Sequence, residues 1–199
     1  MANSFDELVR RTEGLQPWRR VFHAATGVIL VVILRFAPVR DGTALLFIGA
    51  ILVGLVLVDV LRLALPQVNR AFFRTFSLLA SPREAGRVSS STWYMVGVFL
   101  AVVLFPVEAA MAGILVLALA DPAASVVGRL WGRRKLGNGT VLGSASFALV
   151  AFLVLLFFAP WPVAISTAVI STVVESMPLP IDDNLLVTLS TAGALALLL

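Results

Sequence analysis

Seven apolar stretches, separated by short polar segments, follow one another along almost the whole chain. They predict seven transmembrane helices, at roughly Val21–Ala37, Thr43–Leu61, Trp93–Phe105, Val107–Val127, Ser144–Ala159, Pro162–Ser176 and Leu185–Leu199. Several are shorter than the roughly 20 residues that a full crossing needs, so we expect their ends to extend into the flanking segments. Because a helix satisfies its own backbone polar groups in lipid, the sequence predicts one all-α domain over residues 1–199, a polytopic membrane helix bundle.

The composition fits a lipid solvent. Of the 199 residues, 60% are hydrophobic and only 13% are charged, and the mean hydropathy is +1.01. A soluble domain needs more charged surface than this chain can provide. The chain has no cysteine, which excludes thiol catalysis, disulfides and cysteine-ligated zinc. The net charge of +4 is better explained by membrane loops than by a nucleic-acid surface, so we expect no nucleic-acid partner.

Two polar segments, residues 1–20 and 62–92, carry apolar residues at helical spacing. These residues are Phe5, Leu8, Val9 and Leu15 in the first segment, and Val68, Phe72, Phe73, Phe76 and Leu79 in the second. Amphipathic helices of this kind lie in the headgroup plane of a bilayer. We predict an interfacial position for both segments, with membrane anchoring as the simplest role.

The basic residues predict the orientation of the bundle. With the N-terminus in the cytoplasm, the cytoplasmic segments hold Arg10, Arg11, Arg19, Arg20, Arg62, Arg70, Arg74, Arg83, Arg87, Arg129, Arg133, Arg134 and Lys135. Only Arg35 and Arg40 fall on the other side. Because Lys and Arg favour cytoplasmic loops, we expect an integral, multi-pass membrane protein, in the inner membrane if bacterial, whose polar loops face the nucleotides of the cytoplasm. A homo-oligomer is compatible with the sequence.

Asp121 is an ionisable residue well inside a predicted span. Charged groups within the membrane are costly, and are candidate functional residues for that reason. Pro122 lacks a backbone donor and disfavours helix at the residue before it, so we expect the helix to open at Asp121 and form a cation site. The alternative is a structural aspartate paired with an arginine of the bundle. Asp59 and Arg62, three residues apart on a helix, are expected to neutralise each other.

The cytoplasmic loop 128–143 combines glycines with basic residues. Its candidate nucleotide-binding residues, together with the residue that follows it, are Gly128, Arg129, Gly132, Arg133, Arg134, Lys135, Thr140, Gly143 and Ser144. Glycine lets backbone N–H groups approach a ligand closely, and Arg and Lys supply charge for phosphate oxygens. A positive-inside loop without a ligand has the same composition, so the residue types alone favour neither interpretation.

Glu175, Asp182 and Asp183 form an acidic cluster in a segment that contains no Lys or Arg. Neighbouring carboxylates usually need a cation, and oxygen ligands at a cytoplasmic site favour Mg²⁺. The competing interpretation is structural, because Asp183 or Asn184 is a suitable N-cap for the last helix.

His23, the only histidine, lies one turn into the first span. At the cytoplasmic mouth of the bundle it is placed to contact a phosphate or a lipid headgroup, although a lone histidine is more often structural. We predict that Arg20, Glu84 and Thr92 share this lipid headgroup region. Carboxylates suited to Mg²⁺, a basic glycine loop and a lipid-facing body together indicate phosphoryl or nucleotidyl transfer to a membrane lipid.

At these same residues the chain resembles the CTP-dependent lipid kinases, a family that includes dolichol kinase, phytol kinase and yeast-type diacylglycerol kinase and is related to phosphatidate cytidylyltransferase. The resemblance covers nearly the whole chain in the same order. Its elements are Arg19-Arg20 with His23, then Arg83-Glu84 followed by Ser89 to Gly97, then Asp121 with Gly128-Arg129 and Gly132-Arg133, and finally Glu175 with Asp182-Asp183-Asn184-Leu185. The last two elements in tandem are specific to the family.

The resemblance implies a site and a reaction. CTP would be the phosphoryl donor, and a polyprenol, phytol-like or diacylglycerol alcohol would enter from the bilayer. Asp121, Asp182 and Asp183 would be the catalytic residues and, with Glu175, would hold Mg²⁺ and the CTP phosphates. The glycine–arginine loop and Asn184 would bind the nucleotide.

The chain departs from the family pattern at several positions. Ala120 and Pro122 stand where the family has Gly and Ala around the aspartate, and Ser90 replaces a Gly. The family element Lys-Thr/Ser-x-Glu-Gly-Ser becomes Gly-Thr-Val-Leu-Gly-Ser over residues 139–144, so both its Lys and its Glu are missing. Three alternatives to a lipid kinase therefore stay open: a cytidylyltransferase that makes a CDP-lipid, an inactive family member and a small transporter.

Overall fold

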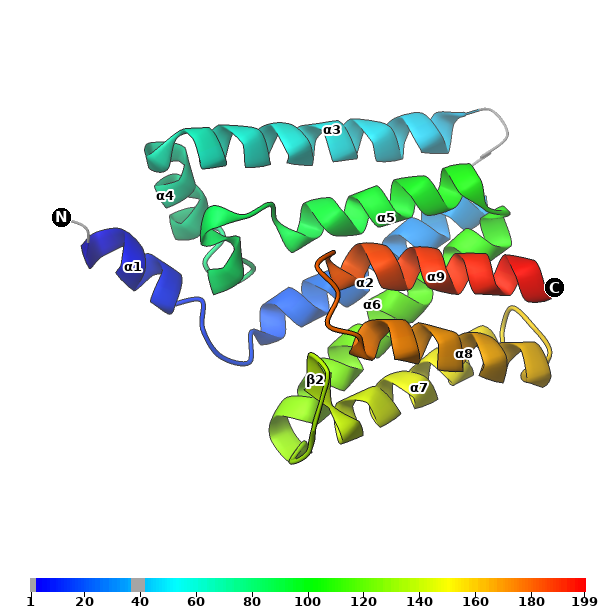
Figure 1. Cartoon of the computed structure of the whole chain (residues 1–199). Coiled ribbons are helices and arrows are strands. Elements are labelled where there is room, and N and C mark those ends of the chain that lie inside the picture. Colours follow the sequence, from blue (N-terminus) through cyan, green and yellow to red (C-terminus); the bar gives the residue numbers. More distant parts are fainter. Residues whose placement is uncertain (1–2, 37–41) are drawn as a thin grey trace.

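All seven apolar stretches are helical in the computed structural model, which describes residues 3–36 and 42–199 (Figure 1). The corresponding helices are α2 (Pro17–Phe36), α3 (Thr43–Ala64), α5 (Ser90–Leu104), α6 (Val107–Trp131), α7 (Val141–Leu155), α8 (Trp161–Ser176) and α9 (Asp183–Leu198). The predicted end of the first span, Ala37, and the arginine Arg40 lie outside the described residues. Within the described part of the chain, two helices, α3 and α6, are long and apolar enough to cross a membrane.

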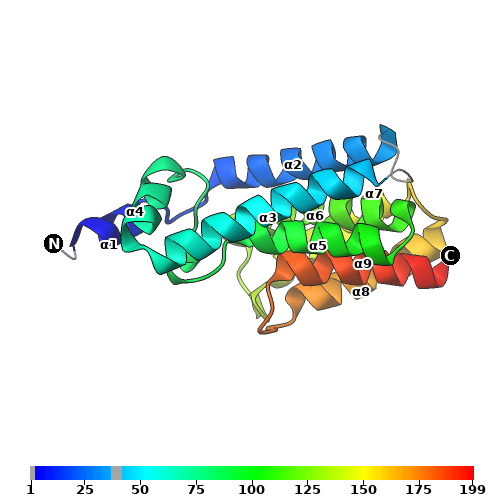
Figure 2. The ribbon, with the colours of Figure 1, turned by 90° about the horizontal axis from the view of Figure 1, so that it is seen from above.

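Helix α6 forms the centre of the bundle and contacts α2, α7 and α9 (Figures 1 and 2). Small residues allow these helices to approach closely. A Cβ atom on Gly113 would lie 2.5 Å from the Thr188 carbonyl oxygen of α9, and a Cβ on Gly27 of α2 would overlap Ala118 of α6. Alanine and glycine at such crossings are typical of helix packing in membranes.

Two short helices, α1 (Asn3–Arg10) and α4 (Pro66–Thr75), lie together beyond one end of the bundle (Figures 1 and 2). The Phe5 ring packs edge-on against Phe73, with 5.5 Å between the ring centroids. A 3₁₀ helix, η2 (Pro82–Gly86), connects this lobe to α5. The helices predicted in both amphipathic segments are therefore confirmed, and their position at a membrane surface stays a prediction.

Two expectations about the backbone are wrong. The structure is not purely helical, because strands β1 (Lys135–Leu136) and β2 (Gly139–Thr140) pair antiparallel as a small hairpin within the glycine–arginine loop. Its turn contains Gly137 at φ +49°, a conformation that favours glycine. Helix α6 also continues without a break through Pro122. Proline removes one helical hydrogen bond, but the packing of α6 against its neighbours keeps the helix intact.

Candidate functional site

The predicted acidic residues come from three helices. Asp121 lies within α6, Glu175 lies in the last turn of α8, and Asp182 and Asp183 begin α9. Asp182 is the N-cap of α9, where we had expected Asp183 or Asn184. One of its carboxylate oxygens accepts hydrogen bonds from the Asn184 backbone N–H at 3.1 Å and from the Asn184 side-chain amide at 2.8 Å. This cap orients Asp182 and leaves Asp183 in the first helical turn.

These carboxylates face one another. Burial, followed by the negative charges of Asp182, Asp121 and Glu175, raises the pKa of Asp183 to about 7. Burial also raises the pKa of Asp182, against the opposing effect of its Asn184 hydrogen bonds. Because charges influence a pKa strongly only at short range, the effect of Asp121 and Glu175 on Asp183 means that the three helices bring their acids to one place. The predicted convergence is therefore present.

The acidic cluster is compatible with a divalent cation but is not a preformed cage. Over residues 3–36 and 42–199, no three His, Asp or Glu side chains already stand in a metal-binding arrangement. Hard carboxylate oxygens are nevertheless the ligands that Mg²⁺ prefers. The described residues give Asp121 no arginine ion pair, which disfavours the structural alternative for it. Glu175 is oriented by the hydroxyl groups of Ser144 and Ser176, which donate to Oε2 at 3.3 and 3.2 Å.

The glycines of loop 128–143 have packing roles. A Cβ on Gly128 would lie 2.9 Å from Thr140 Oγ1, a Cβ on Gly143 would lie 3.1 Å from it, and a Cβ on Gly132 would lie closer still. Thr140 caps α7 by accepting a hydrogen bond from the Gly143 N–H at 3.1 Å. These glycines let α6 and α7 close around the Thr140 side chain, so their presence does not by itself indicate a phosphate site.

The hairpin nevertheless holds basic residues beside the acids. A Cβ on Gly137 would overlap the Ser176 carbonyl oxygen, and Asn138 Nδ2 donates to the Met177 carbonyl oxygen at 3.3 Å, so the hairpin turn lies against the end of α8. The four basic side chains of the loop are exposed, and among the residues that the structure describes none of them forms an ion pair. They are Arg129, Arg133, Arg134 and Lys135. Exposed guanidinium and ammonium groups next to carboxylates suit a metal-bound phosphate chain.

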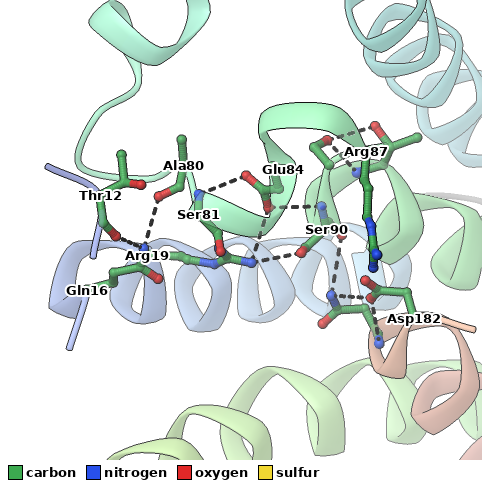
Figure 3. Close-up of polar contacts among 12 residues, drawn as sticks. Thr12, Gln16, Arg19, Ala80, Ser81, Glu84, Arg87, Ser90 and Asp182 are labelled. Atoms are coloured by element: carbon green, nitrogen blue, oxygen red, sulfur yellow. Dashed lines mark hydrogen bonds and ion pairs between the residues drawn. The ribbon is translucent and has the colours of Figure 1, made fainter. Parts of the chain in front are cut away.

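Arg19 links the first helix to the opposite side of the cluster (Figure 3). Its guanidinium lies 3.2 Å from Glu84 Oε1 and donates to Ser90 Oγ at 2.8 Å. The Asn184 side chain donates to the Ser90 carbonyl oxygen at 3.4 Å, and the same amide bonds Asp182. Arg19 was recognised only as part of a motif and was not predicted to be a site residue.

Glu84 and Thr92, predicted to contact lipid headgroups, are buried and bonded within the protein. Glu84 accepts from the backbone N–H groups of Ser81 and Ser90, and Thr92 donates to Asp59 Oδ2 at 2.6 Å. Their role at a headgroup stays a prediction.

Arg20 and His23 lie on the face of α2 that meets α6. Arg20 Nη2 donates to Ser125 Oγ at 2.7 Å, one turn beyond Asp121 on α6. Arg20 Nε, Arg20 Nη1 and His23 Nε2 are buried and have no hydrogen-bond partner among the described residues. An unsatisfied buried polar group costs about 1–3 kcal/mol, so such atoms usually mark a ligand or solvent position. Sequence analysis missed Ser125, although its spacing of four residues from Asp121 places both on one helix face.

The predicted Asp59–Arg62 pair is confirmed, and it is the centre of a larger buried network. Arg62 is only 1% exposed, and its Nε lies 2.6 Å from Asp59 Oδ1. Its remaining donors reach the Glu84 carbonyl oxygen at 2.6 Å and the Arg87 carbonyl oxygen at 2.5 Å. This network fixes η2 and the start of α5, and hence the residues that hold Arg19.

The fold and the site define an apolar, almost entirely helical protein that gathers carboxylates from three helices between a basic hairpin and a buried Arg–His pair. Comparison with known proteins agrees with the class that the motifs indicated. The chain is 32% identical over 140 residues to the CTP-dependent diacylglycerol kinase 1 of Eremothecium gossypii, a match that covers 68% of this chain and 42% of that protein.

A protein of the same name from Schizosaccharomyces pombe is 35% identical over 75 residues, covering 38% of this chain and 34% of the relative. The chain thus matches less than half the length of either relative. No family model matches the chain, and no solved structure does. The resemblance carried by the motifs is confirmed: the chain is related to the CTP-dependent lipid kinases.

Proposed function

We propose that this protein is a CTP-dependent kinase that phosphorylates a membrane lipid alcohol with Mg²⁺ at the cytoplasmic face of a membrane. The observation that carries this proposal is the convergence of Asp121, Glu175, Asp182 and Asp183 beside the basic hairpin. The relatives named CTP-dependent diacylglycerol kinase support CTP as the donor and diacylglycerol as one candidate acceptor. Polyprenol and phytol-like alcohols are the other candidates.

Each part of the site has a role in this reaction. The four carboxylates would hold Mg²⁺, which supplies charge neutralisation at the triphosphate. Asn184, which spans Asp182 and Ser90, would fix the geometry of the acidic cluster, and the hairpin cations would bind the outer phosphate oxygens. The alcohol oxygen forms a bond to the γ-phosphorus while the bond to the bridging oxygen breaks, and CDP leaves. In such a reaction the protein acts mainly by positioning groups and neutralising charge.

A membrane location follows from the same apolar body. Helices α3 and α6 can span a bilayer by length and composition, and large apolar side chains remain exposed along α3. We propose that α2, α5, α7, α8 and α9 cross with them, with the N-terminus and the acidic cluster on the cytoplasmic side. The acids gather at one end of the helices and form no chain through the midplane, which argues against a transporter.

Labelled CTP tests the proposal and separates it from its nearest alternative. Purified protein with Mg²⁺ and a panel of lipid alcohols should transfer label from γ-labelled CTP to the lipid. Label that enters the lipid from the α-position would instead establish a cytidylyltransferase. The Asp-Asp-Asn element favours the kinase.

The missing motif Lys and Glu favour one further candidate, an inactive relative. Gly139 leaves its position without a side chain, and Leu142 is exposed on α7. Thermal unfolding with and without CTP-Mg²⁺ separates the two cases, because a kinase must bind the nucleotide and be stabilised by it. Failure of CTP-Mg²⁺ to shift the unfolding temperature would favour the inactive relative.

A further inference from the structure

Unpartnered polar atoms concentrate at one place in the core. Over the described residues, five buried side-chain nitrogen or oxygen atoms have no hydrogen-bond partner. Four of the five belong to Arg20, His23 and Tyr94, on α2 and α5, and the fifth is the hydroxyl of Thr167 on α8. Buried polar groups are nearly always hydrogen-bonded, so a group of such atoms indicates that something else binds there.

His23 and Tyr94 form a joint polar surface. Their ring centroids are 4.6 Å apart, and the rings are tilted by 40°. Gly27 lies four residues after His23 and therefore on the same face of α2. A Cβ on Gly27 would lie 2.6 Å from the Tyr94 hydroxyl oxygen. The absence of a side chain at this glycine leaves the hydroxyl of Tyr94 uncovered beside the His23 imidazole.

This polar surface adjoins the acidic cluster. His23 lies within electrostatic reach of Asp121 and Asp182. Arg20, one turn earlier on α2, bonds Ser125 of α6 through Nη2 and keeps Nε and Nη1 free. A molecule bound between His23 and Tyr94 would therefore present its polar end to the groups that we propose to bind the metal and the phosphates.

We propose that His23 Nε2 and the Tyr94 hydroxyl bind the acceptor hydroxyl of a neutral lipid alcohol. This inference rests on the proposed function and specifies its acceptor site. A hydroxyl group both donates and accepts, so it can satisfy an imidazole nitrogen and a phenol together. An ester or ether at the same position has no hydrogen to donate and would leave one of the two partners unsatisfied, and a site built to bond a hydroxyl discriminates strongly against analogues without one.

Two matched variants test this assignment. Tyr94→Phe and Thr167→Val each remove one buried, unpartnered hydroxyl, the first at the proposed site and the second far along α8 from it. We measure initial rates with γ-labelled CTP, using dioctanoylglycerol in detergent micelles as the acceptor. Tyr94→Phe should raise the KM for the alcohol about tenfold and leave the KM for CTP unchanged, whereas Thr167→Val should leave both unchanged.

A binding measurement keeps the inference testable without turnover. Dioctanoylglycerol should raise the unfolding temperature of the wild-type protein more than its acetate ester does, and Tyr94→Phe should abolish that difference. If the wild-type protein discriminates in this way but phosphorylates no alcohol, the proposed function fails and the acceptor site stands. If the protein is an active kinase and Tyr94→Phe behaves like Thr167→Val in both measurements, the acceptor site is overturned.

Discussion

The buried pair of Asp59 and Arg62 offers a quantitative test of how the site is held in place. We predict that Arg62→Met lowers the free energy of unfolding by about 3–5 kcal/mol, the usual cost of removing one partner of a buried ion pair. Methionine fills a similar length of space, so the loss reflects electrostatics and hydrogen bonding more than a cavity. Arg62 is 1% exposed, so water cannot replace the lost donors without a rearrangement.

The hydrogen bonds around Arg62 indicate where in this range the value should fall. Asp59 keeps three other donors after the substitution: the Ser89 N–H at 2.9 Å, the Ser89 hydroxyl at 3.1 Å and the Thr92 hydroxyl at 2.6 Å. These bonds partly satisfy the unpaired carboxylate and favour the lower end of the range. The carbonyl oxygens of Glu84 and Arg87 lose their donor, and each unsatisfied group costs about 1–3 kcal/mol if it stays buried.

A double-mutant cycle measures the interaction directly. Unfolding in detergent is followed for Arg62→Met, Asp59→Asn and the double variant, and we expect the two single losses to exceed the loss in the double variant by about 2 kcal/mol. Arg70→Met is the control, because Arg70 is exposed on α4 and its replacement should change stability by about 0.5 kcal/mol or less. Equal stability of Arg62→Met and Arg70→Met would show that the buried network does not hold η2 and α5 together.

Three further predictions concern the acids and the hairpin. Asp121→Asn should lower kinase turnover by roughly a hundredfold or more, since it removes a charge that faces the metal site. Glu108→Gln, at the other end of α6, should retain activity, and equal activity of the two variants would remove Asp121 from the site. Gly139→Lys restores the missing motif lysine at a position whose Cβ would lie 3.9 Å from Glu175 Oε1. It should lower the KM for CTP about tenfold, and a KM that stays unchanged or rises would contradict a phosphate-binding role for the hairpin. The raised pKa of Asp183, about 7 when folded against about 4 when unfolded, costs stability as the pH rises through this interval. Mg²⁺ should offset that cost, so the rise in unfolding temperature on adding Mg²⁺ should be larger at about pH 8 than at about pH 6, and equal shifts would argue against a cation near Asp183.

The helices could be predicted from the sequence because each apolar run is long enough to specify a helix by itself. The hairpin could not, because its paired strands are two residues long and depend on the contact of Gly137 with the end of α8. The expectation of a break at Pro122 failed for a similar reason. Local propensity predicted an open helix, and packing between helices overrode it.

The acidic residues of the site were identified from the sequence, and their partners were not. Asp121 and Asp183 are conspicuous because charge is rare in an apolar chain. Tyr94 and Ser125 are ordinary residues of helices, and their importance appears only when α2 brings Arg20 and His23 against them. A pattern of residue types indicates which groups are costly in the bilayer. Only the packing shows which polar atoms remain without partners.

The placement of the acids relative to the helix ends shows that the cluster is not arranged for stability. Asp182 and Asp183 are at the N-terminus of α9, where the helix dipole favours negative charge. Glu175 is in the last turn of α8, where the dipole opposes it, and it adds to the repulsion that raises the pKa of Asp183. A bundle selected only for folding would gain by replacing Glu175 with a neutral residue. Local conflicts of this kind are expected where function requires them, and a cation shared between α6, α8 and α9 would convert the repulsion into a binding site.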